Sequence, residues 1–173
     1  MEPTSVAPPP SLSGAGDRGG VVIAYAREGR EVLGFVPAAV AIRFAALGAM
    51  IEVAGARPPA RGIALADGEV VTVLALGDGS AAPPASRRDV HDAWQVPGAD
   101  RALVCAASGQ KVALTGGRAV ATGVFARDLL GDGVIHGGRS APLLDVRALY
   151  AEAERAIWAA RAGSGEALGG GAR

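Results

Sequence analysis

The sequence is poor in the side chains that build metal and disulfide sites. It has one cysteine and two histidines in 173 residues. Cys105 lies in an apolar run, which excludes a disulfide framework or a thiolate metal site and predicts a buried, inert thiol. A zinc ion needs three or four converging ligands, so His91 and His136 would have to recruit carboxylates such as Asp89 or Asp92. Exposed loop histidines are the simpler interpretation.

Net charge and long apolar runs are also missing. Seventeen basic and seventeen acidic side chains cancel, which removes the positive surface expected of a nucleic-acid partner. No stretch reaches the ~18 uninterrupted apolar residues of a membrane span, and residues 1–20 lack the basic and apolar regions of a signal peptide. We therefore expect a cytoplasmic protein with no membrane insertion. Aromatic residues make up 4% of the chain, so Val, Leu, Ile and Ala must fill its core.

Catalytic motifs are absent or incomplete. The stretch HGGRSAPLL around Ser140 faintly resembles the nucleophile segment of trypsin-like proteases, but it is one residue short and no segment resembles their histidine motif. The glycine clusters do not follow the strand, loop, helix order of a phosphate loop. Four acidic residues are spread over predicted loop and helix surfaces, and their spacing does not pair any two of them as a general acid and a general base: Asp128, Asp132, Glu152 and Glu154. The sequence predicts no catalytic residue, no cofactor and no metal.

Composition predicts one domain with loose ends. Residues 1–20 are rich in Pro, Gly and Ser and predict a flexible leader, because they offer little surface to bury against the entropy lost on ordering. The glycine-rich residues 163–173 predict a flexible tail for the same reason. The ordered domain is therefore expected to span residues 21–162.

Turn chemistry predicts a mainly β domain. Residues 21–37 indicate a hairpin with its turn at Glu28-Gly29, and residues 61–76 indicate a second hairpin with its turn at Asp67-Gly68. Between them, residues 38–55 fit a strand or a helix by periodicity, although their β-branched and aromatic residues favour a strand. These elements form a first β subdomain, residues 21–80.

The second half repeats this pattern of strands and turns after a connection at residues 77–100. The connection is expected to hold one helical turn. Residues 101–145 show turns at Ser108-Gly109 and Gly137-Gly138, and a break at Gly116-Gly117. Two blocks with the same order of short strands and glycine turns are typical of two small barrels, since closing a sheet removes its exposed edges.

A helix is predicted over residues 146–162. Asp145 is placed to cap its first turn and Gly163 to end it. Its predicted apolar face consists of Val146, Leu149, Tyr150, Ala153, Ile157 and Trp158.

The stretch RGIALADGEVVTVLAL, with Gly62 and Gly68, resembles a segment of CheW-type chemotaxis coupling proteins. That segment reads roughly Gly, two apolar residues, Asn-Leu-Arg-Gly, then a Pro-led apolar strand. REGREVLGFVPAAVAIRF, ASGQKVALTGGRAVATGVF and VIHGGRSAPLLDVRALY, which keeps the expected Leu144-Asp145, are similar to further family segments. The resemblance covers about residues 21–160.

The resemblance implies two intertwined five-stranded β-barrels with a C-terminal helix and no active site. It implies a signalling adaptor that couples the cytoplasmic tip of a methyl-accepting chemoreceptor to a CheA-type histidine kinase. The alternative is a CheW-like barrel used as a protein-binding or oligomeric structural module outside chemotaxis. The contact residues that the family's groove implies are Val40, Ile42, Arg43, Phe44, Arg61, Leu65 and Asp67. For Val40, Ile42 and Phe44, a purely core role is the competing interpretation.

The chain also departs from the family pattern. Leu65 stands where the family usually has Asn, Thr72 where it has Pro, and Ala75 and Gly117 where it has Asp. Asp67 stands in place of Arg, which inverts a charge near the implied receptor groove. A reversed charge at an interface rim changes which partners are tolerated, so we expect a specialised receptor or pathway.

Overall fold

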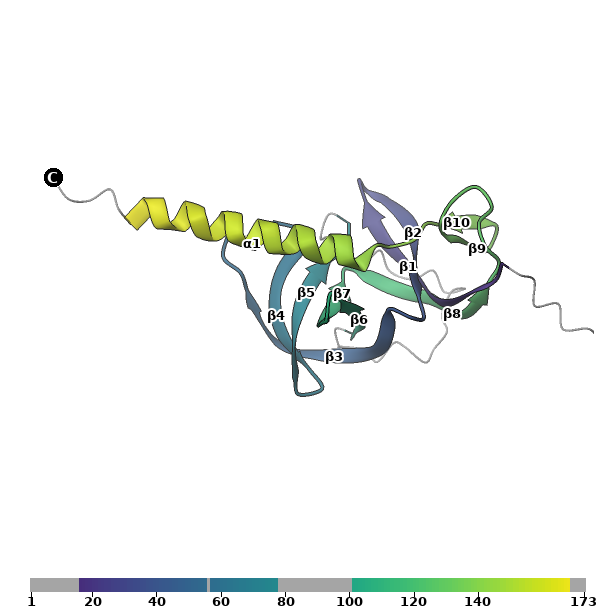
Figure 1. The fold of residues 1–173 in the computed structure, drawn as a ribbon, viewed down its shortest axis with the longest axis horizontal. Coiled ribbons are helices and arrows are strands. Elements are labelled where there is room, and N and C mark those ends of the chain that lie inside the picture. The colour runs from purple at the N-terminus through teal and green to yellow at the C-terminus, as the bar shows by residue number, and fades with distance from the viewer. Residues whose placement is uncertain (1–15, 56, 78–100, 169–173) are drawn as a thin grey trace, which may run out of the picture.

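A computed structural model describes residues 16–55, 57–77 and 101–168 of the chain (Figure 1). Within these residues the chain forms ten strands followed by one long helix. The elements are β1 Arg18–Arg27, β2 Arg30–Pro37, β3 Ala41–Glu52, β4 Ala60–Ala66, β5 Glu69–Ala75, β6 Arg101–Ala107, β7 Gln110–Thr115, β8 Gly117–Phe125, β9 Val134–His136, β10 Arg139–Ala141 and α1 Val146–Leu168. The expectation of a mainly β fold with a C-terminal helix is confirmed.

Five of the strands close into a barrel in the order β3-β4-β5-β7-β6. The barrel closes through a parallel pair, β5 with β7, and through antiparallel pairing of β3 with β6. Burial alternates strictly along β4, because successive side chains of a strand point to opposite faces. One buried cluster consists of small residues from barrel strands alone: Ala45, Ala66, Val71, Ala102, Val104 and Ala113.

The other five strands wrap a second core without closing. They form a three-stranded sheet, β2-β1-β8, and a two-stranded sheet, β10-β9. The two sheets are joined at Phe35, whose N–H donates to the Pro142 carbonyl and whose carbonyl accepts from Leu144 N–H, each at 2.8 Å. Phe35 is fully buried in this core. One of the two expected barrels is therefore closed and the other is open.

The two bodies do not correspond to the two halves of the chain. The barrel takes β3, β4 and β5 from the predicted first subdomain and β6 and β7 from the predicted second. The open half takes β1 and β2 from the first and β8, β9 and β10 from the second. The chain is thus divided between interleaved bodies and not into consecutive units at 21–80 and 101–145, because β1 pairs with β8 across the sequence.

The predicted turns form where turn chemistry places them. Asp67 and Gly68 have φ values of 50° and 83°, the left-handed pair that a two-residue hairpin needs. The hairpins that turn at Glu28-Gly29, Ser108-Gly109 and Gly137-Gly138 are also present. Residues 41–52 form a strand, which settles the choice between strand and helix left open by the sequence.

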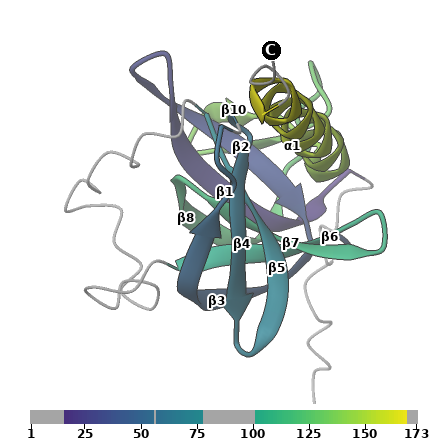
Figure 2. The same cartoon turned by 90° about the vertical axis from the view of Figure 1, so that its left-hand side faces the viewer.

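The helix begins where it was predicted and extends further. The Asp145 carboxylate accepts the N–H of Ala148 at 3.0 Å, which caps the first turn. The helix continues to Leu168, so Gly163 does not end it and residues 163–168 are not a loose tail. It packs against β4, β5 and β6, and Figure 2 shows it end-on above the barrel.

Trp158 is not on the packed face of this helix, contrary to the prediction. Its exposed fraction is 64%, whereas Val146 and Ala153 are buried. At 100° per residue, Trp158 lies about 120° around the helix from Val146, beyond the stripe that meets the barrel. The guanidinium carbon of Arg161 lies 5.6 Å from the Trp158 ring centroid instead.

The start of the domain also differs from the prediction. β1 begins at Arg18, inside the predicted leader, because Gly19 and Gly20 pair with Val124 and Gly123 of β8. Residues 1–15, the predicted helical turn within 78–100, and the tail at 169–173 lie outside the described residues.

Candidate functional site

The candidate site is a groove of about 680 Å³ at the seam between the barrel and the three-stranded sheet. One wall carries Ile42 and Phe44 of β3, and the other carries Val124 of β8. Glycine residues, among them Gly20 and Gly123, line it between these walls. Ile42 and Val124 have exposed fractions of 47% and 72%, so the rim of the groove presents apolar surface to solvent.

A β-bulge accounts for the exposure of Ile42. The pairing of β3 with β6 shifts register between Ala41, which faces Cys105, and Arg43, which faces Val104. Ile42 is the extra residue in this shift, and a bulge re-aims the side chain that it carries. The neighbouring Phe44 remains half-buried and packs against the main core.

Gly20 contributes to the lining of the groove, and the packing of β1 against β2 requires a glycine at this position. A Cβ built at Gly20 would lie 2.3 Å from the Val36 carbonyl oxygen and 2.5 Å from the Phe35 ring. No side chain fits there without displacing β2, so glycine is required for the sheet to pack.

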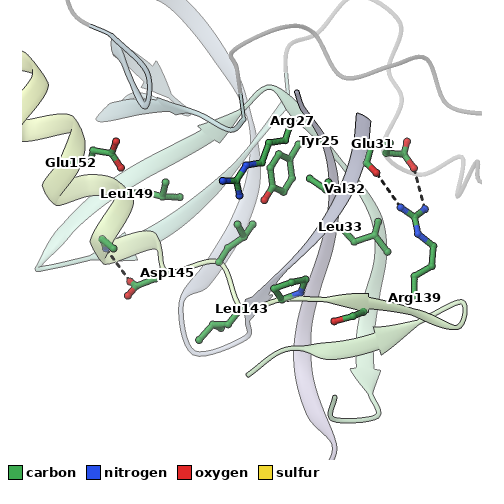
Figure 3. A pocket seen from close by; sticks show the side chains of 14 residues that line it. Tyr25, Arg27, Glu31, Val32, Leu33, Arg139, Leu143, Asp145, Leu149 and Glu152 are labelled. Carbon is green, nitrogen blue, oxygen red and sulfur yellow. Dashed lines mark hydrogen bonds and ion pairs between the residues drawn. The ribbon is translucent and has the colours of Figure 1, made fainter. Parts of the chain in front are cut away.

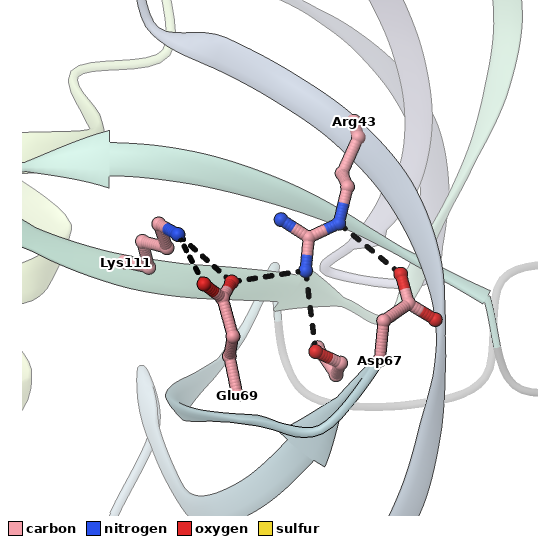
Figure 4. A network of polar contacts seen from close by, with 5 residues as sticks. Arg43, Asp67, Glu69 and Lys111 are labelled. Carbon is pink, nitrogen blue, oxygen red and sulfur yellow. Dashed lines mark hydrogen bonds and ion pairs between the residues drawn. The ribbon is translucent and has the colours of Figure 1, made fainter.

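Arg43 connects the groove to a cluster of four charged side chains (Figure 4). Its Nε donates to Asp67 Oδ2 and its Nη2 to Glu69 Oε2, both at 3.1 Å. Lys111 Nζ donates to the two Glu69 oxygens at 2.6 and 2.8 Å. Two positive and two negative groups balance here, so this end of the groove carries no net charge.

The pKa values in the cluster shift as such pairing requires. Hydrogen bonds to Asp67, and then to Glu69, raise the pKa of the Arg43 guanidinium. The hydrogen bond from Lys111, followed by that from Arg43, lowers the pKa of the Glu69 carboxyl. The carboxylates therefore fix the Arg43 side chain in its charged form beside the groove.

The structure brings some of the predicted contact residues together and separates others. Ile42, Arg43 and Phe44 line the groove, and Asp67 reaches it through its ion pair with Arg43. Val40 is half-buried against the main core and does not line the groove, in line with the core interpretation. Phe44 combines both roles.

The other two predicted residues lie on β4, outside the groove. Arg61 Nη1 donates to Thr115 Oγ1 at 3.4 Å, and Leu65 is 49% exposed on the outer surface of the barrel. Both residues lie on β4, a barrel strand that does not contribute to the groove, whereas the far wall of the groove belongs to β8. Gly20, Gly123 and Val124 went unrecognised because nothing in the local pattern indicates that β1 pairs with β8.

A second cavity, of about 590 Å³, lies between the β1–β2 hairpin, residues 139–145 and the start of α1 (Figure 3). Asp145 is engaged in capping the helix, and Arg139 and Glu31 pair with each other. Tyr25, Arg27 and Glu152 are its other ionisable lining residues. Ser140 lines it too, and its hydroxyl donates to the Asp128 carboxylate, with no histidine among the lining residues.

The remaining reactive side chains have structural surroundings. Ser140 Oγ donates to Asp128 Oδ2 at 2.5 Å, so its hydroxyl serves a loop carboxylate. Cys105 is buried, as predicted, and burial raises the pKa of its thiol to about 12. Among the described residues, which exclude His91, no three His, Cys, Asp or Glu side chains converge as metal ligands would.

Comparisons with known proteins found a similar solved structure. No family model and no curated protein matches the sequence. The crystal structure of the scaffolding protein TtCheW from Thermoanaerobacter tengcongensis is similar to this chain, with a TM-score of 0.47 and 11% sequence identity. The match covers 76% of this chain and 92% of that one. Within the described residues, no helix combines the length and hydropathy that crossing a membrane requires.

Proposed function

We propose that this chain is a non-enzymatic signalling adaptor that couples the cytoplasmic tip of a chemoreceptor to a CheA-type histidine kinase. The observation that carries the proposal is the seam groove, with Ile42 and Val124 exposed on its two walls and backbone glycine between them. A site for catalysis gathers convergent polar groups, whereas a site for protein docking offers apolar anchors. The order and spacing of the glycine turns support the same assignment.

A coupling protein needs a second surface for its second partner. The outer surface of the barrel supplies a candidate in two cross-strand pairs, Ile51 with Ile63 and Leu65 with Val70. The exposed fractions of these four side chains run from 42% to 70%. None of them lines the groove, so the two surfaces can be occupied by different proteins. We assign the groove to the receptor and this outer surface to the kinase.

The test measures binding of each partner separately. Ile42→Glu and Val124→Glu place a carboxylate on either wall of the groove, and Leu129→Glu is the matched control because Leu129 is 92% exposed outside the groove. We expect the two groove variants to lose at least tenfold in affinity for a receptor cytoplasmic fragment and to keep their affinity for the kinase regulatory domain. Unchanged receptor binding by both groove variants would show that the groove is not the receptor site.

The charge cluster sharpens this test. Asp67→Arg removes one of the two ion pairs of Arg43 and places two like charges together, so Glu69 and the Ala66 carbonyl alone hold Arg43 beside the groove. We expect altered receptor affinity with normal folding. Phe44→Ala should weaken receptor binding too, but Phe44 also packs against the core, so its unfolding midpoint must be measured alongside.

The second candidate function is a self-associating structural module. The exposed outer surface of the barrel favours it, together with Leu129 and Leu130, which are 92% and 100% exposed. Light scattering over a concentration series distinguishes the two functions. Assembly of the chain alone supports the module, whereas a monomer that binds receptor and kinase supports the adaptor.

A further inference from the structure

A small cavity of about 180 Å³ lies at the open half of the domain, away from the seam groove. Its lining comes from β2, β8, β9 and β10, the strands that fail to close a second barrel. The charged and ionisable residues among them are Arg118, Arg139, His136 and Glu31, and the apolar ones are Leu33 and Val120. Positive groups therefore outnumber the single carboxylate in this lining.

Glu31 is already shared between the two arginines. Arg118 Nη2 donates to its Oε2 at 2.9 Å, and Arg139 Nη1 to its Oε1 at 3.5 Å. Arg139 Nη2 also donates to the Glu31 backbone carbonyl at 3.2 Å (Figure 3). One carboxylate balances one guanidinium, so a full positive charge is left over at the cavity, beside the His136 ring.

Arg118 also has a hydrogen-bond donor, its Nε, that no acceptor among the described residues satisfies. Its Nε is buried and has no hydrogen-bond acceptor, although its side chain keeps 17% of its surface exposed. A buried donor on a charged group is costly when it has no partner, and it is strongly stabilised by an acceptor of opposite charge. Arg118 lines the cavity together with Arg139, so an oxyanion bound there would lie beside both residues.

We propose that this cavity binds a small oxyanion, a phosphate or carboxylate group, held between Arg118 and Arg139. Guanidinium groups present planar forks of donors that match the oxygens of such groups. The volume lies below the range of sites for drug-sized ligands, so a single oxyanion group fits and a nucleotide does not. Leu33 and Val120 keep water from part of the site and strengthen the attraction.

Binding would also complete the open half. The anion would join β8 to β10 where Glu31 alone now bridges them, so it would stabilise the folded chain in proportion to its occupancy. This inference is independent of the adaptor function, because no residue of the cavity lines the seam groove.

The experiment follows thermal unfolding of the full chain in sodium phosphate and in sodium chloride at equal ionic strength, with calorimetric titration of phosphate. We expect a saturable rise of the unfolding midpoint in phosphate. Arg118→Lys keeps the charge and loses Nε, and Arg139→Gln changes a residue that is more than half exposed. Each should weaken phosphate binding at least tenfold, whereas Arg147→Lys, on the exposed first turn of α1, should not.

A parallel titration with acetate identifies the source of the anion. Saturable binding of acetate as well as phosphate supports a carboxylate of a peptide or metabolite, and binding of phosphate alone supports free phosphate or a phosphoryl group. The proposal is overturned if neither anion binds, or if phosphate raises the midpoint equally in the wild type, Arg118→Lys and Arg139→Gln.

Discussion

The closed barrel and the open half solve the same problem by different means. The barrel pairs every strand on both sides, and small residues such as Ala66 and Ala113 suffice to fill it. The open half leaves one edge of β8 without a continuous partner strand. It is held by a large side chain, Phe35, and by ion pairs that cross from strand to strand. Ion pairs cross strands in both halves, so aromatic packing is what takes the place of barrel closure in the open half.

The aromatic contribution is concentrated at one place. The Phe35 and Phe125 rings meet edge to face, with centroids 6.1 Å apart, and Phe125 meets His136 in the same way at 5.9 Å. Such pairs add roughly 0.5–1.5 kcal/mol beyond the area that they bury. The three rings come from β2, β8 and β9, all strands of the open half, so the integrity of that half depends on a few side chains.

Phe35→Ala should give the largest effect. The change empties the centre of the open half, and we expect a loss of roughly 3–5 kcal/mol in the free energy of unfolding. Val104→Ala in the closed barrel removes two carbons of an equally buried residue, for which we expect about 2 kcal/mol. Urea unfolding measures both. A larger loss for Val104→Ala would mean that the barrel is the weaker half.

Glu31→Gln tests the ion pairs of the open half. It leaves Arg118 unpaired and mostly buried, for which we expect a loss of roughly 1–3 kcal/mol in phosphate-free buffer. The matched change in the barrel, Glu69→Gln, removes a carboxylate whose side chain is 47% exposed and should alter stability far less. Equal effects in chemical unfolding would remove the contrast between the two halves.

Acid titration tests a hydrogen-bonded carboxylate of the open half, with a smaller effect. The hydrogen bonds from Ser140 and the Leu130 N–H lower the pKa of Asp128, whose ordinary value is 3.8. A lowered pKa stabilises the folded state above the ordinary value, and this contribution disappears as the pH falls through the lowered one.

Asp128→Asn should therefore reduce stability at neutral pH and make its decline below pH 3.8 shallower. Thermal unfolding midpoints measured from neutral pH into acid show this directly. An unchanged acid limb in the variant would contradict the assigned hydrogen bonds.

The smallest expected change concerns Cys105. Because burial raises the pKa of its thiol to about 12, we expect no reaction with a thiol reagent at pH 8 in the folded protein. Reaction should follow unfolding, and its rate reports the opening of the core between the barrel and the β1–β2 hairpin. Rapid labelling of the native chain would show that this core opens readily.

Local chemistry was predictable from the sequence and long-range pairing was not. Asp67-Gly68 fixes the position of its hairpin because these two residues readily adopt the left-handed backbone that a two-residue turn needs. Asp145 fixes the start of the helix by capping its first turn. The pairing of β1 with β8 and the parallel pairing of β5 with β7 join segments about 100 and 40 residues apart. No local pattern specifies such partners, so the intertwining of the two bodies was implied by the family resemblance alone and the strand pairs that produce it were not predicted.

The candidate site was predictable to the same extent. Ile42, Arg43 and Phe44 follow from one segment that resembles the family, and they share the groove. Gly20, Gly123 and Val124 come from two strands that meet only through the fold. The prediction for Trp158 was wrong, because the apolar face of the helix is narrower than the sequence pattern indicated and Trp158 is exposed.

The most direct test of the account is a ¹⁵N NMR titration of the chain with a receptor cytoplasmic fragment. We expect the amide resonances of Ile42, Phe44, Gly123 and Val124, from both walls of the seam groove, to shift together. Shifts confined to β4 and β5, or to the loop at Leu129 and Leu130, would contradict it and place the contact elsewhere.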